Sequence, residues 1–464
     1  MKKTIVYLAI ALQVVACGTG DTPETKTVSE SFSNTPENDV VTNTSFSTPA
    51  VRSSQLANQQ DTDKWKDQVN LFSFESFQSG SASKNFLSSP YNELSLFALT
   101  SAAANNNSLS EINEYFGYLN PTGFTEQQQF FRVFNTLEQN LTLSASNSKQ
   151  SFQSVNTMWG QQTYAFSAEF LAQSATYFGT ELFSIDTDKD LQLFSDSYIQ
   201  QLAKVTGEFL PSETDSFIRP NDSVLLISNM SFLETSWKTP FDPQQTKLGE
   251  FKLLDQSIID VPLMHIELDT HYYTDDKGTF ITLPSSDPEW SFFLYSAHDI
   301  DEHRANKNNM TLEQLNHMKS NSYLTQVKIS MPSFSIALKA TGLDSSMEIF
   351  DKDNADISNL SANAQRDLYA NIYNGQSLLV INEQGIKIAG ESFVNLKQKP
   401  LPVFVEQNSS YGLFITNNVN TDFLIFLIEE EVIVEFNHPF IYFVFHNPTG
   451  TLMYSGNLVD PTKD

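Results

Sequence analysis

The chain has 464 residues, and its 27 lysines and arginines against 55 aspartates and glutamates give a formal net charge of −28. This balance, with no cluster of basic residues, excludes a nucleic-acid-binding protein, which needs a basic face for the phosphates. A single cysteine excludes internal disulfides and cysteine-based zinc or iron–sulfur sites. Hydrophobic residues make up 40% of the chain, enough for a large globular core.

The N-terminus has the layout of a secretory signal. A short basic start precedes a mostly apolar run, Thr4 to Ala16, that is too short to anchor a helix across a bilayer. The sole cysteine, Cys17, follows directly. This pattern resembles the lipobox of bacterial lipoproteins, which implies a signal peptide of residues 1–16 and lipid chains on Cys17. The alternative is an ordinary signal peptide with an incidental cysteine.

The lipobox resemblance implies a secreted, lipid-anchored protein at the bacterial outer membrane or cell surface, with periplasmic or extracellular placement as alternatives. No acidic residue directly follows Cys17, which favours the outer membrane in double-membraned bacteria. An acidic surface is repelled by anionic headgroups, so we expect membrane contact only through the anchor. Acyl chains hold by apolar burial, at about 0.8 kcal/mol per buried CH2.

Residues 17–62 form the next segment, rich in Ser, Thr, Asn, Pro and acidic residues and poor in large apolar ones. Such a composition cannot bury a core, so it predicts a lipidated disordered tether; a small folded domain is the alternative. From residue 63 onward the composition changes, and residues 63–464 are predicted to form one folded domain.

Within this domain, predicted helices come first and predicted strands follow. Helical spacing of apolar residues or helix-start signals mark the segments 65–77, 90–104, from 108, 126–141, 167–178 and 190–205. Strand-like runs occupy 223–232, 258–266, 278–283, 290–295, 324–331, 368–381, 432–436, 440–445 and 451–458. The lack of regular βα alternation predicts an α+β fold with helices packed on large, mainly antiparallel sheets.

Enzyme motifs are missing from the sequence. It contains no H-E-x-x-H, G-x-S-x-G, P-loop or G-x-G-x-x-G motif, and its seven histidines are dispersed. We therefore expect no catalytic residues, no metal and no cofactor.

The C-terminal segment from Phe436 to Pro461 is the most specific feature: a strand, a Pro-Thr-Gly turn and a returning apolar strand. It resembles the C-terminal signature of the serpins. Further segments match motifs of that family in the same order: Asn85–Pro90, Asn156–Trp159, Ser228–Phe251, Val261–Met264, Met331–Phe334 and Ala355–Ser358. The resemblance extends from about Trp65 to Pro461.

The resemblance implies a serpin fold with an exposed reactive-centre loop at about residues 384–431. It implies a monomeric suicide inhibitor, not an enzyme, whose partner is a serine or cysteine protease. The cleaved loop of such an inhibitor inserts into the central sheet as a strand and traps the acyl-enzyme. A non-inhibitory surface binding protein that uses the extended loop for interaction is the alternative. A lipoprotein enzyme or glycan binder outside the family is a third class.

The loop hinge is expected at Glu383, Gln384 and Gly385, followed by Ile386, Ile388 and Gly390. In an inserted strand alternate residues share a face. Ile386, Ile388 and Gly390 then share a small or apolar face that can be buried, and both charged residues fall on the other face. Inhibitory members of the family usually have Thr and then Ala here, and bulkier Ile is expected to slow threading into a sheet. The alternative is a fixed strand, or a loop that never inserts.

Four positions are expected to gate the opening of the central sheet: Ser89, Asn92, Asn229 and Gly375. Two of them depart from the family, since Asn92 stands where the family usually has Ser and Gly375 where it often has His. The gating contacts must therefore be rebuilt or missing.

Loop length is the main anomaly. The resemblance implies about 24 positions from the hinge Glu to the first Phe of the C-terminal signature, whereas 53 separate Glu383 from Phe436, so roughly 29 residues are extra. Counting from the hinge places the scissile bond at Lys399, before Pro400, with Lys397 beside it; counting back from Phe436 places it at Ile428.

Overall fold

The computed structural model describes residues 52–117, 127–142, 151–186, 191–210, 223–341, 347–399 and 432–463. The chain divides into a unit of residues 1–40, outside the described residues, and a unit of residues 41–464, to which the following refers. The predicted signal peptide, Cys17, most of the predicted tether and Ile428 also lie outside the described residues. Among the described helices, none has the length and hydrophobicity to cross a membrane.

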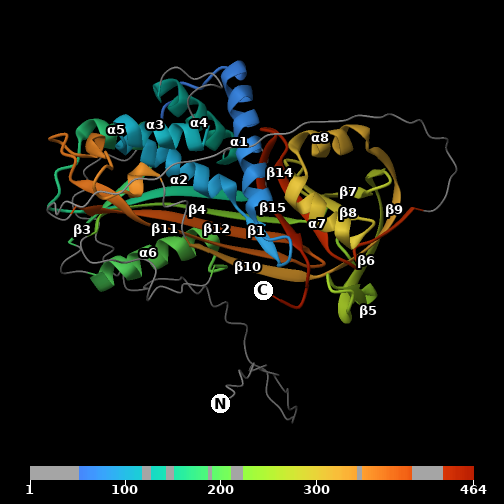
Figure 1. Cartoon of the computed structure of the whole chain (residues 1–464). Coiled ribbons are helices and arrows are strands. Elements are labelled where there is room, and N and C mark those ends of the chain that lie inside the picture. Colours follow the sequence, from blue (N-terminus) through green and yellow to red (C-terminus); the bar gives the residue numbers. More distant parts are fainter. Residues whose placement is uncertain are drawn as a thin grey trace, which may run out of the picture. The chain divides into compact units, whose positions relative to one another are not determined.

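A six-stranded sheet forms the centre of this unit (Figure 1). Its strands, in spatial order, are β10 (Phe334–Thr341), β11 (Leu368–Ile381), β12 (Gly385–Gln398), β4 (Ser223–Ser236), β2 (Phe152–Gln161) and β3 (Glu181–Ile185). All neighbours are antiparallel except β2 and β3. The run from Val224 to Leu233 is buried throughout because helices cover both faces of the sheet, which explains its continuous apolar sequence.

A nine-stranded sheet carries the C-terminal hairpin. Its path runs β1 (Phe86–Ser88), β15 (Thr451–Leu458), β14 (Phe440–His446), β8 (Trp290–Ala297), β7 (Gly278–Pro284), β6 (Ile258–Thr274), β9 (Tyr323–Pro332) and β13 (Val432–Glu435), while β5 (Lys247–Lys252) pairs with β6. Every residue of β14 and β15 is buried, so the apolar C-terminal signature is a core hairpin.

Helices cover the six-stranded sheet unequally (Figure 1). Five lie on one side: α1 (Gln59–Ser79), α2 (Pro90–Ala103), α3 (Asn106–Tyr115), α4 (Gln127–Thr142) and α5 (Ala168–Phe178). On the opposite side lies α6 (Leu191–Thr206). Two more, α7 (Ile300–Asn309) and α8 (Leu312–Asn321), lie by the nine-stranded sheet. α2 is buried on almost every side, against β4 and β12, which accounts for apolar residues on most of its faces.

The predicted α+β architecture is confirmed, but the predicted end of the tether is wrong. Helix α1 begins at Gln59, inside the segment assigned to the tether, because the side chain of Asn58 accepts a hydrogen bond from the Asp61 N–H and caps the helix. The residues before it also contact the folded unit, since the Ser53 N–H donates to the Thr176 carbonyl at 2.8 Å.

Candidate functional site

The segment after the predicted hinge is a fully paired strand of the central sheet. In β12, Gly390 stands opposite Ser231 of β4 on one side and Ser377 of β11 on the other. The sequence predicts an exposed loop from residue 384, whereas the structure places residues 385–398 inside the sheet. The alternation of small and apolar residues makes this possible, because both faces of the strand are covered.

The hinge residues form the tight turn between β11 and β12. The side-chain oxygen of Asn382 accepts hydrogen bonds from the N–H groups of Gln384 at 2.9 Å and Gly385 at 3.3 Å. The Glu383 carboxylate accepts from the Thr246 hydroxyl at 2.7 Å. A Cβ on Gly385 would lie 2.2 Å from the Thr235 carbonyl oxygen, so only glycine lets the two strands approach here.

One face of β12 packs on α2. Ile386 and Ile388 on this face are 2% and 0% exposed, and each burial contributes about 1.5–3 kcal/mol. A Cβ on Gly390 would lie 2.5 Å from Asn92 Oδ1 and 2.9 Å from Ser89 Oγ. The glycine therefore lets the inserted strand reach the start of α2.

Three of the four predicted gating positions meet at this point. Asn92 Nδ2 donates to Asn229 Oδ1 at 2.7 Å and to the Gly390 carbonyl at 3.1 Å. Asn92 Oδ1 accepts from the Ser89 hydroxyl and, at 2.9 Å, from the Ser231 hydroxyl. The asparagine thus binds the central strand β4 and the inserted strand at once. With asparagine at this position, the start of α2 is therefore bonded to both strands.

Gly375, the fourth gating position, lines a cavity of about 530 Å3 between α1, α2 and the sheet. A Cβ on Gly375 would lie 3.2 Å from Ser392 Oγ. Glu93 also lines the cavity, and burial raises the pKa of its carboxyl to about 7. The structure thus separates Gly375 from the contacts of Asn92.

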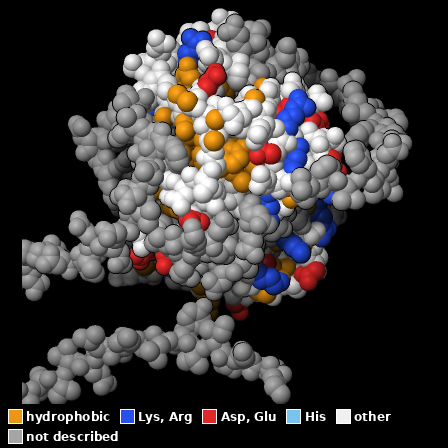
Figure 2. All heavy atoms as spheres, turned by 90° about the vertical axis from the view of Figure 1, so that its left-hand side faces the viewer, with side chains coloured by type: hydrophobic (Ala, Val, Ile, Leu, Met, Phe, Trp, Pro, Cys, Tyr) orange, Lys and Arg blue, Asp and Glu red, His pale blue; other side chains and the backbone are white. Residues whose placement is uncertain are grey.

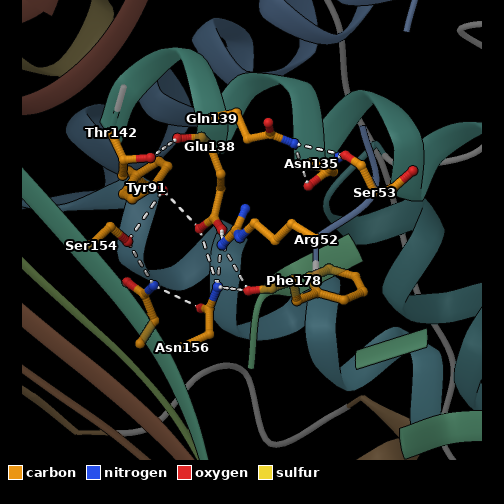
Figure 3. Close-up of polar contacts among 11 residues, drawn as sticks. Arg52, Ser53, Tyr91, Asn135, Glu138, Gln139, Thr142, Ser154, Asn156 and Phe178 are labelled. Carbon is orange, nitrogen blue, oxygen red and sulfur yellow. Dashed lines mark hydrogen bonds and ion pairs between the residues drawn. The ribbon is translucent and has the colours of Figure 1, made fainter. Parts of the chain in front are cut away.

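A buried polar network continues from the gating residues to the N-terminal segment (Figure 3). Asn229 Nδ2 donates to Asn156 Oδ1 at 2.8 Å, and Asn156 Nδ2 donates to the Glu138 carboxylate at 3.1 and 3.2 Å. The Tyr91 hydroxyl donates to the same carboxylate at 2.9 Å, and Arg52 forms an ion pair with it at 2.5 Å. A chain of hydrogen bonds therefore joins β12 to the first described residue.

Sequence reasoning missed the two charged members of this network. Glu138 is 1% exposed although it is acidic, and a carboxylate among the apolar positions of α4 was the available signal. Arg52 fell in the segment predicted to be a disordered tether. Its path over α5 depends on Gly179, where a Cβ would lie 2.1 Å from Arg52 Nε.

The opposite face of β12 lies under α6 and is buried as well. Ala389, Glu391 and Phe393 on this face are 0%, 4% and 4% exposed. The sequence placed both charges of the strand on this face, but the covering helix cannot be inferred from strand alternation. Near the start of the strand Lys387 reaches solvent, where it pairs with Glu234 at 2.9 Å, and at the other end Lys397 is half-exposed.

The candidate scissile positions lie at the far end of β12. Lys397 stands opposite Tyr369 in the sheet. The Lys399 N–H donates to the Asp367 carbonyl at 2.6 Å, and its Nζ donates to the Ala355 carbonyl at 2.6 Å. Ile428 lies outside the described residues.

Figure 2 shows the side of the molecule on which α5 and β3 lie, where acidic and basic side chains are interspersed with a band of hydrophobic ones.

The uncut chain keeps β13 paired while β12 is inserted. β13 pairs in parallel with residues 327–330 of β9. A strand of 14 residues spans about 46 Å, at about 3.3 Å per residue, and the 32 residues 400–431 reach at most about 115 Å. Without the roughly 29 extra residues, about three would remain, with a reach of about 10 Å. The long loop is thus what lets both strands coexist.

No group of three or more His, Cys, Asp or Glu side chains suited to a metal ion occurs among the described residues. The site is instead a slot for a strand, formed by β4, β11, α2 and α6. What the arrangement can do is mechanical: it can accept and hold the segment that follows the hinge.

Comparison with known proteins gives a consistent result. A family model described as serpin (serine protease inhibitor) matches residues 67–461. The chain is 23% identical to leukocyte elastase inhibitor A of Mus musculus over 408 residues, which covers 84% of this chain and 98% of that protein. A loop-inserted, cleaved ovalbumin mutant superimposes with a TM-score of 0.71 at 15% identity, covering 86% of this chain and 100% of that one. The thermophilic serpin tengpin in the latent state gives 0.67 at 17% identity, covering 88% and 100%.

Proposed function

The chain belongs to the serpin family, and on that premise we propose that it is a suicide inhibitor of serine or cysteine proteases. The predicted fold, helices on large mainly antiparallel sheets, is confirmed. Family membership favours an inhibitor over an enzyme, and relatives named leukocyte elastase inhibitor make elastase-like proteases the first targets to test.

The fit of β12 in the central sheet is the observation that carries the proposal. The segment following the hinge pairs with β4 and β11 along its length, and its large apolar side chains are buried. A protease that cleaves the exposed loop is bound to it as an acyl-enzyme. Insertion then moves that bond by about the 46 Å length of β12 and deforms the protease before water can release it.

The position of the scissile bond follows from this mechanics. Trapping requires that the acyl-enzyme be held against the end of the sheet after insertion. Each residue between the end of β12 and the scissile bond lets the protease lie about 3.3 Å farther from the sheet. Cleavage at Lys397 or Lys399 leaves at most one residue between the end of β12 at Gln398 and the protease, whereas cleavage at Ile428 leaves 30 residues. Because Pro400 makes the bond after Lys399 a poor trypsin substrate, the bond after Lys397 is the favoured candidate for a trypsin-like target.

Incubation with trypsin-, elastase-, subtilisin- and papain-like proteases tests the proposal. We expect a complex that survives boiling in detergent, and for a trypsin-like target mass spectrometry of its hydrolysed product should locate the cleaved bond after Lys397. A matched control is Gly390→Val, which should be cleaved at the same bond without forming a complex. Cleavage of the wild type with neither a complex nor a gain in stability contradicts the inhibitory proposal.

A non-inhibitory binding protein is the second candidate, favoured by the inserted β12 in an uncut chain with β13 still paired. Deletion of residues 400–428 separates the two functions. In an inhibitor the shortened loop should be unable to insert uncut, so complex formation should rise and nicking should then raise the thermal midpoint. In a binder the deletion should abolish partner binding and yield no complex.

Lipid anchoring at Cys17 is part of the proposed function, placing a monomeric inhibitor at the bacterial outer membrane or cell surface. Its support is the position of the only cysteine directly after the apolar run. Growth with labelled palmitate should label the wild type but not Cys17→Ser, and the variant should leave the membrane fraction. Equal labelling of the two would contradict the anchor.

A further inference from the structure

Glu391 is the only acidic residue of β12, and it lies near the middle of that strand on the face that α6 covers; Figure 1 shows α6 against this side of the sheet. It stands opposite Gln376 of β11 and Met230 of β4. Its side chain is 4% exposed. A carboxylate is costly to bury without a cation, because the protein interior replaces little of its hydration.

Two neutral groups contact the buried carboxyl. The Tyr198 hydroxyl of α6 donates to Glu391 Oε1, and Gln376 Nε2 donates to Glu391 Oε2. Tyr198 is 0% exposed. A tyrosine hydroxyl can donate to a carboxylate or accept from a protonated carboxyl, so the same contact serves both forms of Glu391.

Charged groups on the surrounding elements do not neutralise it. On α6, Asp196 and Lys204 are exposed. On the strands of this face, Lys387 pairs with Glu234. On α2, across the sheet, Glu93 adds a second acidic group. Among the residues that the structure describes, no lysine or arginine forms an ion pair with Glu391.

Burial therefore raises the pKa of Glu391, the hydrogen bonds from Tyr198 and Gln376 offsetting part of this rise. In a loop outside the sheet the same carboxyl is hydrated, with an ordinary pKa of about 4.3. The inserted state thus holds its proton at pH values where the exposed loop has lost it. Burial and the charge of Glu391 also raise the pKa of Tyr198 well above its usual value, so Tyr198 stays neutral.

We propose that Glu391 couples loop insertion to proton uptake, so that the strand enters the sheet with a neutral carboxyl and insertion is favoured by acid. Below the ordinary pKa both states are protonated and insertion carries no penalty. As the pH rises above it, the exposed loop ionises first, and the penalty grows until the raised pKa is reached and stays constant above it. The inference deepens the proposed inhibitory function and rests on it.

The test compares the full-length, loop-inserted protein, nicked by a broad-specificity protease where necessary, as wild type and as Glu391→Gln. Guanidinium unfolding is measured from pH 5 to pH 8. We expect the stability of the variant to rise relative to that of the wild type as the pH rises, so that at pH 8 its unfolding equilibrium constant is below that of the wild type. Glu234→Gln, at a partly exposed carboxylate of the same sheet face, is the matched control and should keep the wild-type profile.

Infrared difference spectra give a second readout that does not depend on unfolding. The wild type minus Glu391→Gln spectrum, recorded from pH 5 to pH 8, should contain the carbonyl stretch of a protonated carboxyl group, and this band should persist to higher pH than the band of an exposed glutamate. If Glu391→Gln does not fold, Tyr198→Phe, which removes a donor to the charged form, should move the pH dependence of stability to higher pH.

Parallel pH profiles for wild type and Glu391→Gln, or an infrared band of an ionised carboxylate only, would overturn the inference. The proposed function is judged separately. A detergent-stable protease complex with parallel profiles refutes the proton coupling and leaves the inhibitor intact. Diverging profiles without any complex support the coupling and refute the inhibitor.

Discussion

The two faces of β12 differ in how they are packed when the strand is inserted in the sheet. The face toward α2 is small, apolar or neutral, and on it only a glycine at position 390 leaves room for Asn92. The face toward α6 buries the carboxyl of Glu391 against Tyr198. Shape governs insertion on the first face, and protonation governs it on the second. One strand can therefore be controlled by steric fit and by pH independently.

The largest effect is expected from overpacking the face of β12 that lies against α2. In Gly390→Val, the new Cβ would lie 2.5 Å from Asn92 Oδ1, so β12 cannot approach α2. We expect the inserted state to lose about 3 kcal/mol or more, as severe overpacking does. Guanidinium unfolding of the nicked protein measures the loss. Lys387→Val, the same kind of side chain at an exposed position of β12, is the control and should change stability by less than about 1 kcal/mol.

The next effect probes the network beneath that face. Arg52→Met leaves the buried Glu138 carboxylate without its cation, so the free energy of unfolding should fall by about 2–3 kcal/mol. Lys66→Met removes the exposed pair with Asp63 and should cost less than about 1 kcal/mol. Urea denaturation measures both. Equal losses in the two variants would show that Arg52 does not anchor the network.

A smaller loss is expected from Asn92→Ser, which installs the residue usual in the family. Serine cannot reach Asn229 Oδ1 and the Gly390 carbonyl together, so one buried acceptor loses its donor and the inserted state loses about 2 kcal/mol. Because both groups are neutral, the loss should be the same at pH 5 and pH 8. A loss that grows with pH would contradict the division of labour between the faces.

The smallest effect is expected from Glu93, a buried carboxyl of α2 on the other side of the sheet from Glu391. Its pKa is raised to about 7 by burial, so the folded state keeps a proton that the unfolded chain loses above about pH 4.5. Stability should therefore fall as the pH rises toward 7. Glu93→Gln should be neutral at pH 5 and stabilising by about 1 kcal/mol at pH 8.5, a figure reduced for partial solvent contact. Thermal unfolding at the two pH values measures it, and equal effects at both would contradict the shift.

The sequence was sufficient for the architecture because apolar periodicity and turn signals act locally, and ordered motifs placed the segments. It also placed Gly390 and Asn92 in the region of strand insertion. It did not anticipate Arg52 bound to Glu138, because the partners lie 86 positions apart and meet only after α4 and α5 have packed. Nor did it anticipate Glu391 under α6, since strand alternation says which residues share a face but not what covers it.

The inserted state of an uncut chain was also unexpected. The resemblance implies a loop that inserts after cleavage, and the sequence alone gives its extra length no mechanical role. The role of the extra residues follows from the simultaneous pairing of β12 and β13. The segment that joins the end of β12 to the start of β13 must return along β12, which spans about 46 Å.

Amide hydrogen exchange across residues 385–398 tests the central claim, that this segment is a strand between β4 and β11, most directly. The account predicts that after nicking, and in uncut protein incubated until its exchange pattern no longer changes, these amides are protected as strongly as those of β4 and β11. Rapid exchange of residues 385–398 in the nicked protein, with β4 and β11 still protected, would contradict it.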